Sequence, residues 1–179
     1  VQGIGKVGMD LVRRLTAVGA ETIVTDPNAE AVAFAVETFG SKAVPLREIY
    51  DIECDVFSPC ALGAVLNDET IPRLRCAAIA GSANNQLAVD RDAEQIAGRG
   101  ILYAPDFVVN AGGVINIAVE KGGYSPERAA AMVDRIYDNL TSVFATADEE
   151  GLDPHRAAMR FATRRIDAAG GRRYRPRID

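Results

Sequence analysis

Three glycines near the start of the chain, Gly3, Gly5 and Gly8, constrain its fold more than any other feature. A Gly-x-Gly-x-x-Gly pattern becomes informative when a strand precedes it, a helix follows it and an acidic residue comes about 20 positions later. Residues 1–2 fit the end of a strand that is truncated in this chain. Apolar residues between 6 and 18 recur at intervals of three and four, which predicts a helix.

Each glycine in such a turn has its own physical role. The first makes the tight bend, the second lets a pyrophosphate approach the backbone, and the third lets the helix lie against its strand. Those roles fall to Gly3, Gly5 and Gly8. The free N–H groups at the helix start, where Lys6 and Val7 lie, would then face phosphate oxygens. The turn therefore predicts a dinucleotide cofactor.

The next acidic residue favours one form of that cofactor. Asp26 follows a β-branched run over residues 21–25, a predicted strand, and lies eighteen positions after Gly8. A carboxylate here accepts hydrogen bonds from the adenosine ribose and repels a 2′-phosphate, so NAD is favoured over NADP. The alternative is a structural turn with a solvated aspartate, which Pro27 and Asn28 would also fit.

Composition and charge narrow the classes of function. A chain of 179 residues with 48% hydrophobic content can bury one good core. Its net charge of −5 gives no electrostatic reason to expect nucleic acid or an anionic membrane as a partner. No apolar run approaches the length of a membrane span. We therefore expect one cofactor-binding domain with a helical appendage.

Three cysteines and one histidine are the residues to test for metal or nucleophile chemistry. Cys54, Cys60 and Cys76 show no metal-ligand spacing, so we expect no metal site and a reducing cytoplasm. Cys54 and Cys76 are expected to be core thiols, whereas Cys60 ends a strand and is placed to line a cofactor cleft. His155 comes at the start of a predicted helix, and we expect it at the surface.

Strand-like and helix-like segments alternate through most of the chain. After the strand at 21–25, strands are predicted at 43–44, 55–59, 76–80 and 101–104, and helices at 28–39, 67–74 and 90–97, the last capped by Asp90. Such alternation is typical of a mostly parallel sheet with helices on both faces. The predicted fold is α/β, a Rossmann-type doubly wound sheet with C-terminal helices.

After a Gly-Gly pair the alternation gives way to helices, predicted at 114–120, 126–150 and 154–168. Ser125 is expected to cap the long helix and Gly151 to end it. We assign residues 1–122 to a dinucleotide-binding domain and residues 123–179 to a helical extension that packs on it. The basic tail at 170–177 either binds an anion or is solvated.

Ligands of an open α/β sheet collect at the carboxyl ends of its strands, near the point where the strand order reverses. The loops expected there carry small or amide side chains, and the further cofactor contacts predicted in them are Cys60, Ala61, Ala83, Asn84, Asn85 and Asn110. Small residues admit a ribose and a nicotinamide against the backbone, and amides both donate and accept hydrogen bonds. The alternative for any one asparagine is that it caps a loop.

Five segments of the chain, 3–8, 24–26, 59–67, 81–87 and 103–116, resemble the glutamate/leucine/phenylalanine/valine dehydrogenases, and most of all the leucine and phenylalanine branch. The resemblance implies an NAD-dependent enzyme that reversibly deaminates an L-amino acid to a 2-oxo acid and ammonia. It also implies a homo-oligomer whose subunits associate through a separate amino-terminal domain. That domain supplies the family's catalytic lysine and aspartate, so we expect no catalytic residue and no turnover in this chain alone.

The resemblance implies roles for four residues at the substrate end. Asn85 and Asn110 match family positions that face the nicotinamide and the substrate. Val114 and Ile117 match positions that line the side-chain pocket. Because an apolar wall offers a glutamate carboxylate no partner, Ile117 favours an apolar substrate, branched-chain or aromatic.

Two other functions stay open at this point. One is a dehydrogenase with glutamate as its substrate, which deamination rates on leucine, valine, phenylalanine and glutamate would distinguish. The other is a stand-alone NAD-binding or redox-sensing module without catalysis, which the reading frame upstream of Val1 would distinguish.

Overall fold

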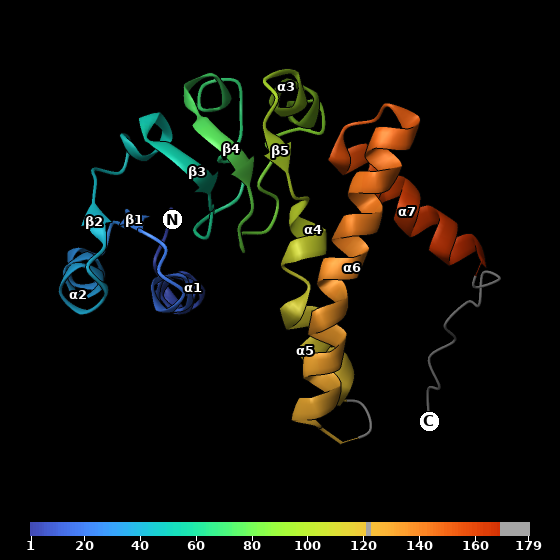
Figure 1. Ribbon diagram of the computed structural model, residues 1–179, viewed down its shortest axis with the longest axis horizontal. Helices are drawn as coiled ribbons and strands as arrows, with labels where there is room; N and C mark the ends of the chain where they lie inside the picture. Colours follow the sequence, from blue (N-terminus) through green and yellow to red (C-terminus); the bar gives the residue numbers. More distant parts are fainter. Residues whose placement is uncertain (121–122, 169–179) are drawn as a thin grey trace, which may run out of the picture.

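The computed structural model of the chain describes residues 1–120 and 123–168. It shows a parallel sheet with helices around it and a group of helices beyond the last strand (Figure 1). The basic tail at 170–177 lies outside the described residues. None of the helices in the described ranges is both long enough and apolar enough to cross a membrane.

The sheet is parallel throughout the part of the chain that the structure describes. Its strands are β1 (Ile23–Val24), which pairs with β2 (Lys42–Ala43), and β3 (Glu53–Phe57), which pairs with β4 (Arg75–Ile79), itself paired with β5 (Leu102–Tyr103). Gln2 forms single bridges to Thr25 and to Pro59, so it joins the two groups of strands. With Gln2 counted as the first strand, the order across the sheet is 3-2-1-4-5-6, which confirms the predicted doubly wound α/β fold.

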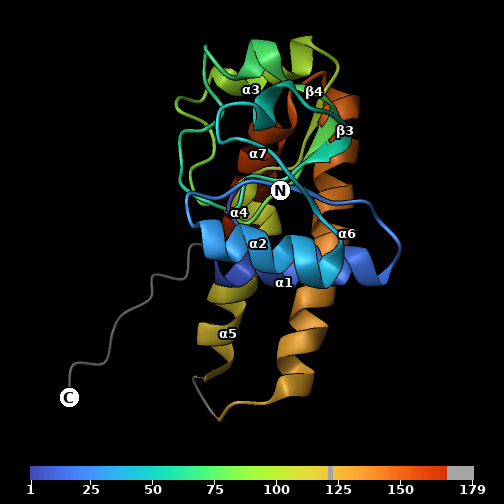
Figure 2. The ribbon, with the colours of Figure 1, turned by 90° about the vertical axis from the view of Figure 1, so that its left-hand side faces the viewer.

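Helices cover both sides of the sheet. The helices α1 (Lys6–Ala17) and α2 (Ala29–Phe39) lie next to each other on one side, and α3 (Asp92–Gly98) lies on the other (Figure 1, Figure 2). Local chemistry sets the ends of α2. The Asn28 side chain accepts hydrogen bonds from the N–H groups of Glu30 and Ala31, and Gly40 ends the helix with a φ of +68°. The helix predicted at 28–39 is confirmed.

The apolar core holds the carboxyl ends of the strands in place. Its main cluster lies among β3, β4, β5 and α3 and comprises Ile49, Phe57, Leu66, Ile71, Leu74, Ile79, Ile96, Ile101 and Tyr103. A second cluster joins α1, α2 and β1 and comprises Ile4, Val12, Val24 and Ala35. Ile4 lies inside the glycine turn, so this turn is packed against the core on one side and open on the other.

Beyond β5 the described chain is helical, with α4 (Asp106–Val109), α5 (Gly112–Glu120), α6 (Pro126–Glu150) and α7 (Pro154–Ala168). The long helix α6 runs along α4 and α5 and packs against α7 (Figure 1). Ser125 Oγ accepts the N–H of Arg128 at 3.2 Å, and Gly151 ends α6 with a φ of +64°. Both predicted ends of the long helix are confirmed, whereas the domain boundary at residue 122 stays a prediction.

One local helix prediction is wrong, and the helix predicted at 90–97 is present but is not capped by Asp90. The helix predicted at 67–74 is reduced to one 3-10 turn, η2 (Ile71–Arg73), because Pro72 has no N–H with which to continue it. The helix predicted to be capped by Asp90 begins instead at Asp92, and the side chain of Asp90 is 96% exposed.

His155 is not the surface residue that the sequence predicts. Its side chain is only 14% exposed, and its ring packs edge-on against Phe107 with 5.6 Å between ring centroids. Its Nε2 atom lies 3.6 Å from a carboxylate oxygen of Asp90. The contact between α4 and α7, which are far apart in the sequence, therefore leaves this ring only partly exposed.

The cysteines are free thiols, each half-buried. Cys54 and Cys76 lie side by side in register on β3 and β4, and burial raises the pKa of both thiols. They were predicted as core thiols. Cys54 is less buried than expected because it lines a cavity beside β3.

Candidate functional site

The candidate site lies where the strand order reverses. Gln2 sits between β1 and β3, and its backbone N–H donates to the Ser58 carbonyl at 2.9 Å. The Cys60 N–H donates back to the Gln2 carbonyl at 2.7 Å. The glycine turn after Gln2 and the loop after β3 therefore leave the sheet at the same edge, next to each other. In doubly wound folds this edge is where ligands bind.

The three glycines meet three different surroundings. Gly3 has a φ of +88°, and a Cβ atom there would overlap Ala61. A Cβ atom on Gly8 would overlap the carbonyl oxygen of Gly3, so α1 could not approach the turn. A Cβ atom on Gly5 would meet nothing within 4 Å. Gly3 and Gly8 are thus required by the backbone, while Gly5 leaves open space for a group that approaches from outside.

The start of α1 presents hydrogen-bond donors to that space. Its cap residue is Gly5, which has no side chain to satisfy the helix, and the first helical bond runs from the Met9 N–H to the Gly5 carbonyl at 2.9 Å. Within residues 1–120 and 123–168, the N–H groups of Lys6, Val7 and Gly8 have no acceptor. Unpaired donors at the positive end of a helix dipole form an anion-binding site.

Asp26 reaches back to the glycine turn. Its Oδ2 accepts the N–H of Ile4 at 2.8 Å, and its Oδ1 accepts the N–H of Asn28 at 2.8 Å. The sequence alone did not reveal that Asp26 supports the glycine turn, because this bond depends on two strand ends lying side by side. Each carboxylate oxygen can accept a second hydrogen bond, so the residue keeps capacity for a ribose hydroxyl.

The loops after β3 and β4 are hydrogen-bonded to each other. Asn84 and Asn85 of the second loop, together with Asn110, are called the amide rim below. The Ala64 N–H donates to the Asn85 carbonyl at 2.7 Å, and the Leu66 N–H donates to the Gln86 carbonyl at 2.9 Å. Asn85 has a φ of +52°, an uncommon conformation for a residue with a side chain. Backbone held in this way is concentrated at ligand sites.

Two of the three asparagines predicted for the rim are hydrogen-bonded to each other. Asn110 Nδ2 donates to Asn84 Oδ1 at 2.6 Å and lies 3.5 Å from the Ala83 carbonyl oxygen. Asn110 comes directly after α4, so the pair links the loop after β4 to the helical part. Asn84 and Asn85 are both exposed, and their amides are accessible to a ligand. Of the cofactor residues predicted here, Ala83 is buried and offers its carbonyl alone.

Cys60 and Ala61 lie beside the glycine turn. Cys60 is half-buried, with its Sγ 3.5 Å from Ser58 Oγ, and Ala61 packs against Gly3. Both residues therefore lie against the glycine turn, in the loop that leads toward the amide rim.

Val114 and Ile117 lie on one side of α5, which starts two residues after Asn110. Their side chains are 72% and 64% exposed, although both are aliphatic. They offer an apolar surface four and seven residues along the chain from Asn110.

The chemistry of these groups is that of binding and orientation. The site combines main-chain N–H groups, one carboxylate, one thiol and several amides. In the described ranges, no three of the His, Cys, Asp and Glu side chains are grouped so that they could hold a metal ion. The arrangement suits an elongated ligand with an anionic middle, a hydroxyl-bearing end at Asp26 and an amide-bearing end at Asn84 and Asn110.

Comparison with known proteins shows the family of the chain. The family model described as Glutamate/Leucine/Phenylalanine/Valine dehydrogenase matches residues 24–173. Leucine dehydrogenase of Geobacillus stearothermophilus is 53% identical over 167 residues, which are 93% of this chain and 46% of that protein. Phenylalanine dehydrogenase of Bacillus thermotolerans is 44% identical over 179 residues, covering 97% of this chain and 47% of that protein.

A solved structure shares the fold closely. The crystal structure of L-tryptophan dehydrogenase from Nostoc punctiforme superposes with a TM-score of 0.91 at 42% sequence identity, covering 93% of this chain and 51% of that one. The chain thus spans about half the length of the relatives that it matches.

Proposed function

The chain belongs to the glutamate/leucine/phenylalanine/valine dehydrogenase family, and on that premise we propose that it is the NAD-binding part of an amino-acid dehydrogenase. The proposed reaction is the reversible oxidative deamination of an apolar L-amino acid, branched-chain or aromatic, to a 2-oxo acid and ammonia. One observation carries the cofactor assignment: unpaired N–H groups at the start of α1 face the open space beside Gly5.

The residues present fit a dinucleotide from end to end. Its diphosphate would accept hydrogen bonds from the N–H groups of Lys6 and Val7, and its adenosine ribose would lie at Asp26. The charge of Asp26 opposes the extra phosphate of NADP, so NAD is the proposed cofactor. The nicotinamide end would lie at Asn85 and Asn110, where amides can pair with its carboxamide.

When bound, the cofactor would supply the redox chemistry, because a nicotinamide can accept a hydride from the α-carbon of an amino acid. The chain's own residues bind and orient. Cys60 and Ala61 would lie along the nucleotide, and Asn85 and Asn110 would face both the nicotinamide and the substrate.

An apolar substrate side chain fits the exposed aliphatic surface of α5. Val114 and Ile117 would form one wall of the side-chain pocket, and neither can pair with a carboxylate. A glutamate substrate is the alternative, and it would need a polar partner at that wall. Relatives named leucine and phenylalanine dehydrogenases are consistent with the apolar reading.

The catalytic lysine and aspartate would come from a domain that precedes this one, through which the subunits would also associate. Support comes from the length of the relatives, because the chain matches about half of each. The free thiols are consistent with the proposed cytoplasmic location.

Calorimetric titration of the chain with NAD and NADP tests the cofactor assignment. We expect binding of NAD, much weaker binding of NADP and no NADH production from any amino acid by this chain alone. Absence of NAD binding would contradict the proposal.

The substrate assignment needs the protein with its preceding domain. Deamination rates on leucine, valine, phenylalanine and glutamate should be highest for an apolar amino acid. A glutamate preference would support the alternative substrate. NAD binding without turnover of any of the four would favour a non-catalytic NAD-binding or redox-sensing module.

A further inference from the structure

One buried side chain of the amide rim is unlike the others. Gln86 is fully buried, in the loop between β4 and α3. Its side-chain Nε2 donates to the Gly81 carbonyl at 2.9 Å and to the Ala83 carbonyl at 3.0 Å. Both hydrogens of the amide nitrogen are therefore used, and both acceptors are main-chain groups of the same loop.

The loop is anchored at its outer side as well. The Ala83 N–H donates to the Pro59 carbonyl at 3.0 Å, and a Cβ atom on Gly81 would overlap that same carbonyl oxygen. The Gln86 carbonyl accepts the N–H of Leu66 at 2.9 Å. Gln86 thus closes the loop from inside while its backbone ties the loop to the one after β3.

The Ala83 carbonyl connects Gln86 to the predicted ligand contacts. This oxygen accepts from Gln86 Nε2 at 3.0 Å and has Asn110 Nδ2 at 3.5 Å, and the same Asn110 nitrogen donates to Asn84 at 2.6 Å. Asn85, the direct neighbour of Gln86, has a φ of +52°, a left-handed conformation that asparagine adopts more readily than most residues.

Stability alone is a weak reason for a glutamine at this position. Gln86 Oε1 is buried and accepts no hydrogen bond from the described residues. A buried acceptor without a partner disfavours the folded state. The side chain is useful here for its two donors, and methionine or glutamate, which are similar in length, offer neither at neutral pH.

We propose that Gln86 is a positioning residue for the nicotinamide end of the cofactor. It touches no ligand itself, since it is fully buried, and acts by holding Ala83, Asn84 and Asn110 in place. Its side chain makes no hydrogen bond to the glycine turn or to Asp26. Its influence is therefore confined to one end of the cofactor. The inference rests on the proposed function, because it requires that the chain binds a nicotinamide dinucleotide.

ADP-ribose, which has every part of the cofactor except the nicotinamide, separates the two ends. Calorimetry of the 179-residue chain with NADH and with ADP-ribose would compare the wild type with Gln86→Met. We expect the variant to bind NADH about tenfold more weakly and ADP-ribose within about twofold of the wild type.

The matched control is Thr22→Val, which removes a different buried hydrogen bond. Thr22 Oγ1 lies 2.7 Å from Ser41 Oγ at the far end of the sheet. This variant should lose stability but bind both ligands like the wild type. Equal weakening of both ligands in Gln86→Met, or no weakening at all, would overturn the positioning role. A wild type that binds ADP-ribose but not NADH would overturn it too. A wild type that binds neither ligand would instead overturn the proposed function, and this inference with it.

A second measurement needs no variant. In the NMR spectrum of the wild type, the side-chain amide signals of Gln86 and Asn110 should shift when NADH is added and stay in place with ADP-ribose. Shifts of equal size with both ligands, or none with NADH, would refute the inference even if Gln86→Met does not fold.

Discussion

The two ends of the candidate site are built in different ways. At the glycine turn, the groups available to bind a ligand are main-chain N–H groups. The lack of a side chain at Gly5 leaves open space beside them. At the amide rim the groups are side chains from two separate segments, such as Asn84 and Asn110, joined by hydrogen bonds across the fold. The first end depends on spacing along the chain, and the second depends on how the loops pack. A substitution should therefore act locally at the turn and through several neighbours at the rim.

The largest expected effect is at Gly8. Because a Cβ atom there would overlap the Gly3 carbonyl, Gly8→Ala must shift α1 or the turn. We expect the free energy of unfolding, measured by urea denaturation, to fall by about 1–3 kcal/mol, and NAD binding to be lost. Gly5→Ala is the matched control, since its Cβ meets nothing within 4 Å. It should fold like the wild type and still bind NAD poorly, and equal destabilisation by both substitutions would contradict this account.

The second largest effect on NAD affinity is expected from substitution of Asp26. Asp26→Ala removes the acceptor of the Ile4 N–H and the charge that opposes a 2′-phosphate. We expect NAD affinity, measured by calorimetry, to fall by about tenfold or more and the preference over NADP to shrink. Asp26→Asn keeps one acceptor oxygen without the charge, so it should shrink the preference with a smaller loss of NAD affinity. If Asp26→Ala leaves the affinities for both cofactors unchanged, the ribose role is wrong.

A smaller effect on cofactor affinity is expected from a substitution in the amide rim. Asn110→Ala removes the donor to Asn84, but the loop keeps its anchors at Pro59 and Leu66. NADH affinity should fall by about threefold to tenfold, while ADP-ribose affinity stays unchanged. An equal loss with both ligands would show that the two ends of the site are not independent.

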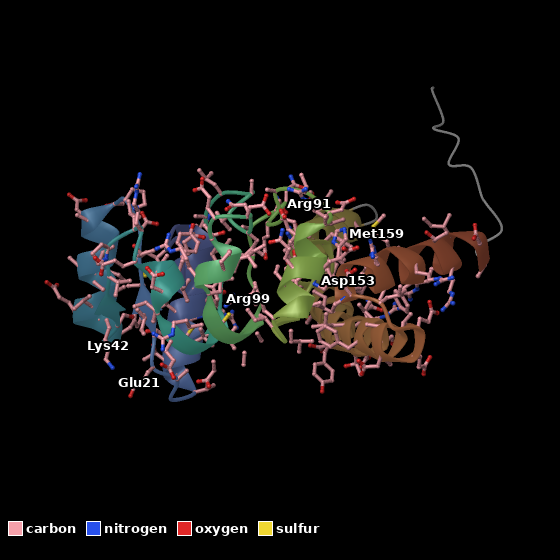
Figure 3. The ribbon with its side chains drawn as sticks, turned by 90° about the horizontal axis from the view of Figure 1, so that it is seen from above. Glu21, Lys42, Arg91, Arg99, Asp153 and Met159 are labelled. Atoms are coloured by element: carbon pink, nitrogen blue, oxygen red, sulfur yellow. The ribbon has the colours of Figure 1, made fainter. Side chains whose placement is uncertain are left out.

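The smallest effect, a change in stability alone, is expected from an ion pair far from both ends of the candidate site. Figure 3 shows Glu21 and Lys42 at the edge of the molecule near α2, where Lys42 Nζ lies 2.9 Å from Glu21 Oε2. The hydrogen bond from Lys42 holds the pKa of the Glu21 carboxyl below its ordinary value. Since the folded pKa is the lower one, this contribution is present above the unfolded pKa and is lost as pH falls through the folded pKa.

Thermal melts of Lys42→Met test that contribution. At pH 7 the variant should melt slightly below the wild type, because an exposed ion pair stabilises little. The difference should vanish as pH falls through the lowered pKa of Glu21, where its carboxylate becomes protonated. NAD affinity should be the same in both proteins. A difference in melting that persists at low pH would point to a cause other than this pair.

Much of the fold follows from local patterns. The helix at Ala29–Phe39 was predictable because Asn28 and Gly40 mark its ends within a few residues. The family was also readable, since its motifs are long and occur in order. The helix predicted at 67–74 failed because Pro72 lacks the N–H with which a helix would continue. The surface position predicted for His155 failed because no local pattern reveals that α7 packs against Phe107.

The residues of the candidate site likewise fall into those that the sequence could identify and those that only the structure reveals. Gly3, Gly5, Gly8 and Asp26 could be named from spacing, because neighbours along the chain create the turn. That Asp26 holds the Ile4 N–H, or that Gln86 supports the asparagines, could not be named. Those bonds join residues whose proximity arises only when strands and loops pack.

The amino-acid sequence by itself determined the glycine turn, the alternating α/β order and the family, because each depends on spacings of a few residues. Tertiary structure alone decided which loops share one edge of the sheet, how deeply His155 is buried, and which buried amide supports the rim. The physical reason is that hydrogen bonds and packing between distant segments depend on the whole core having formed.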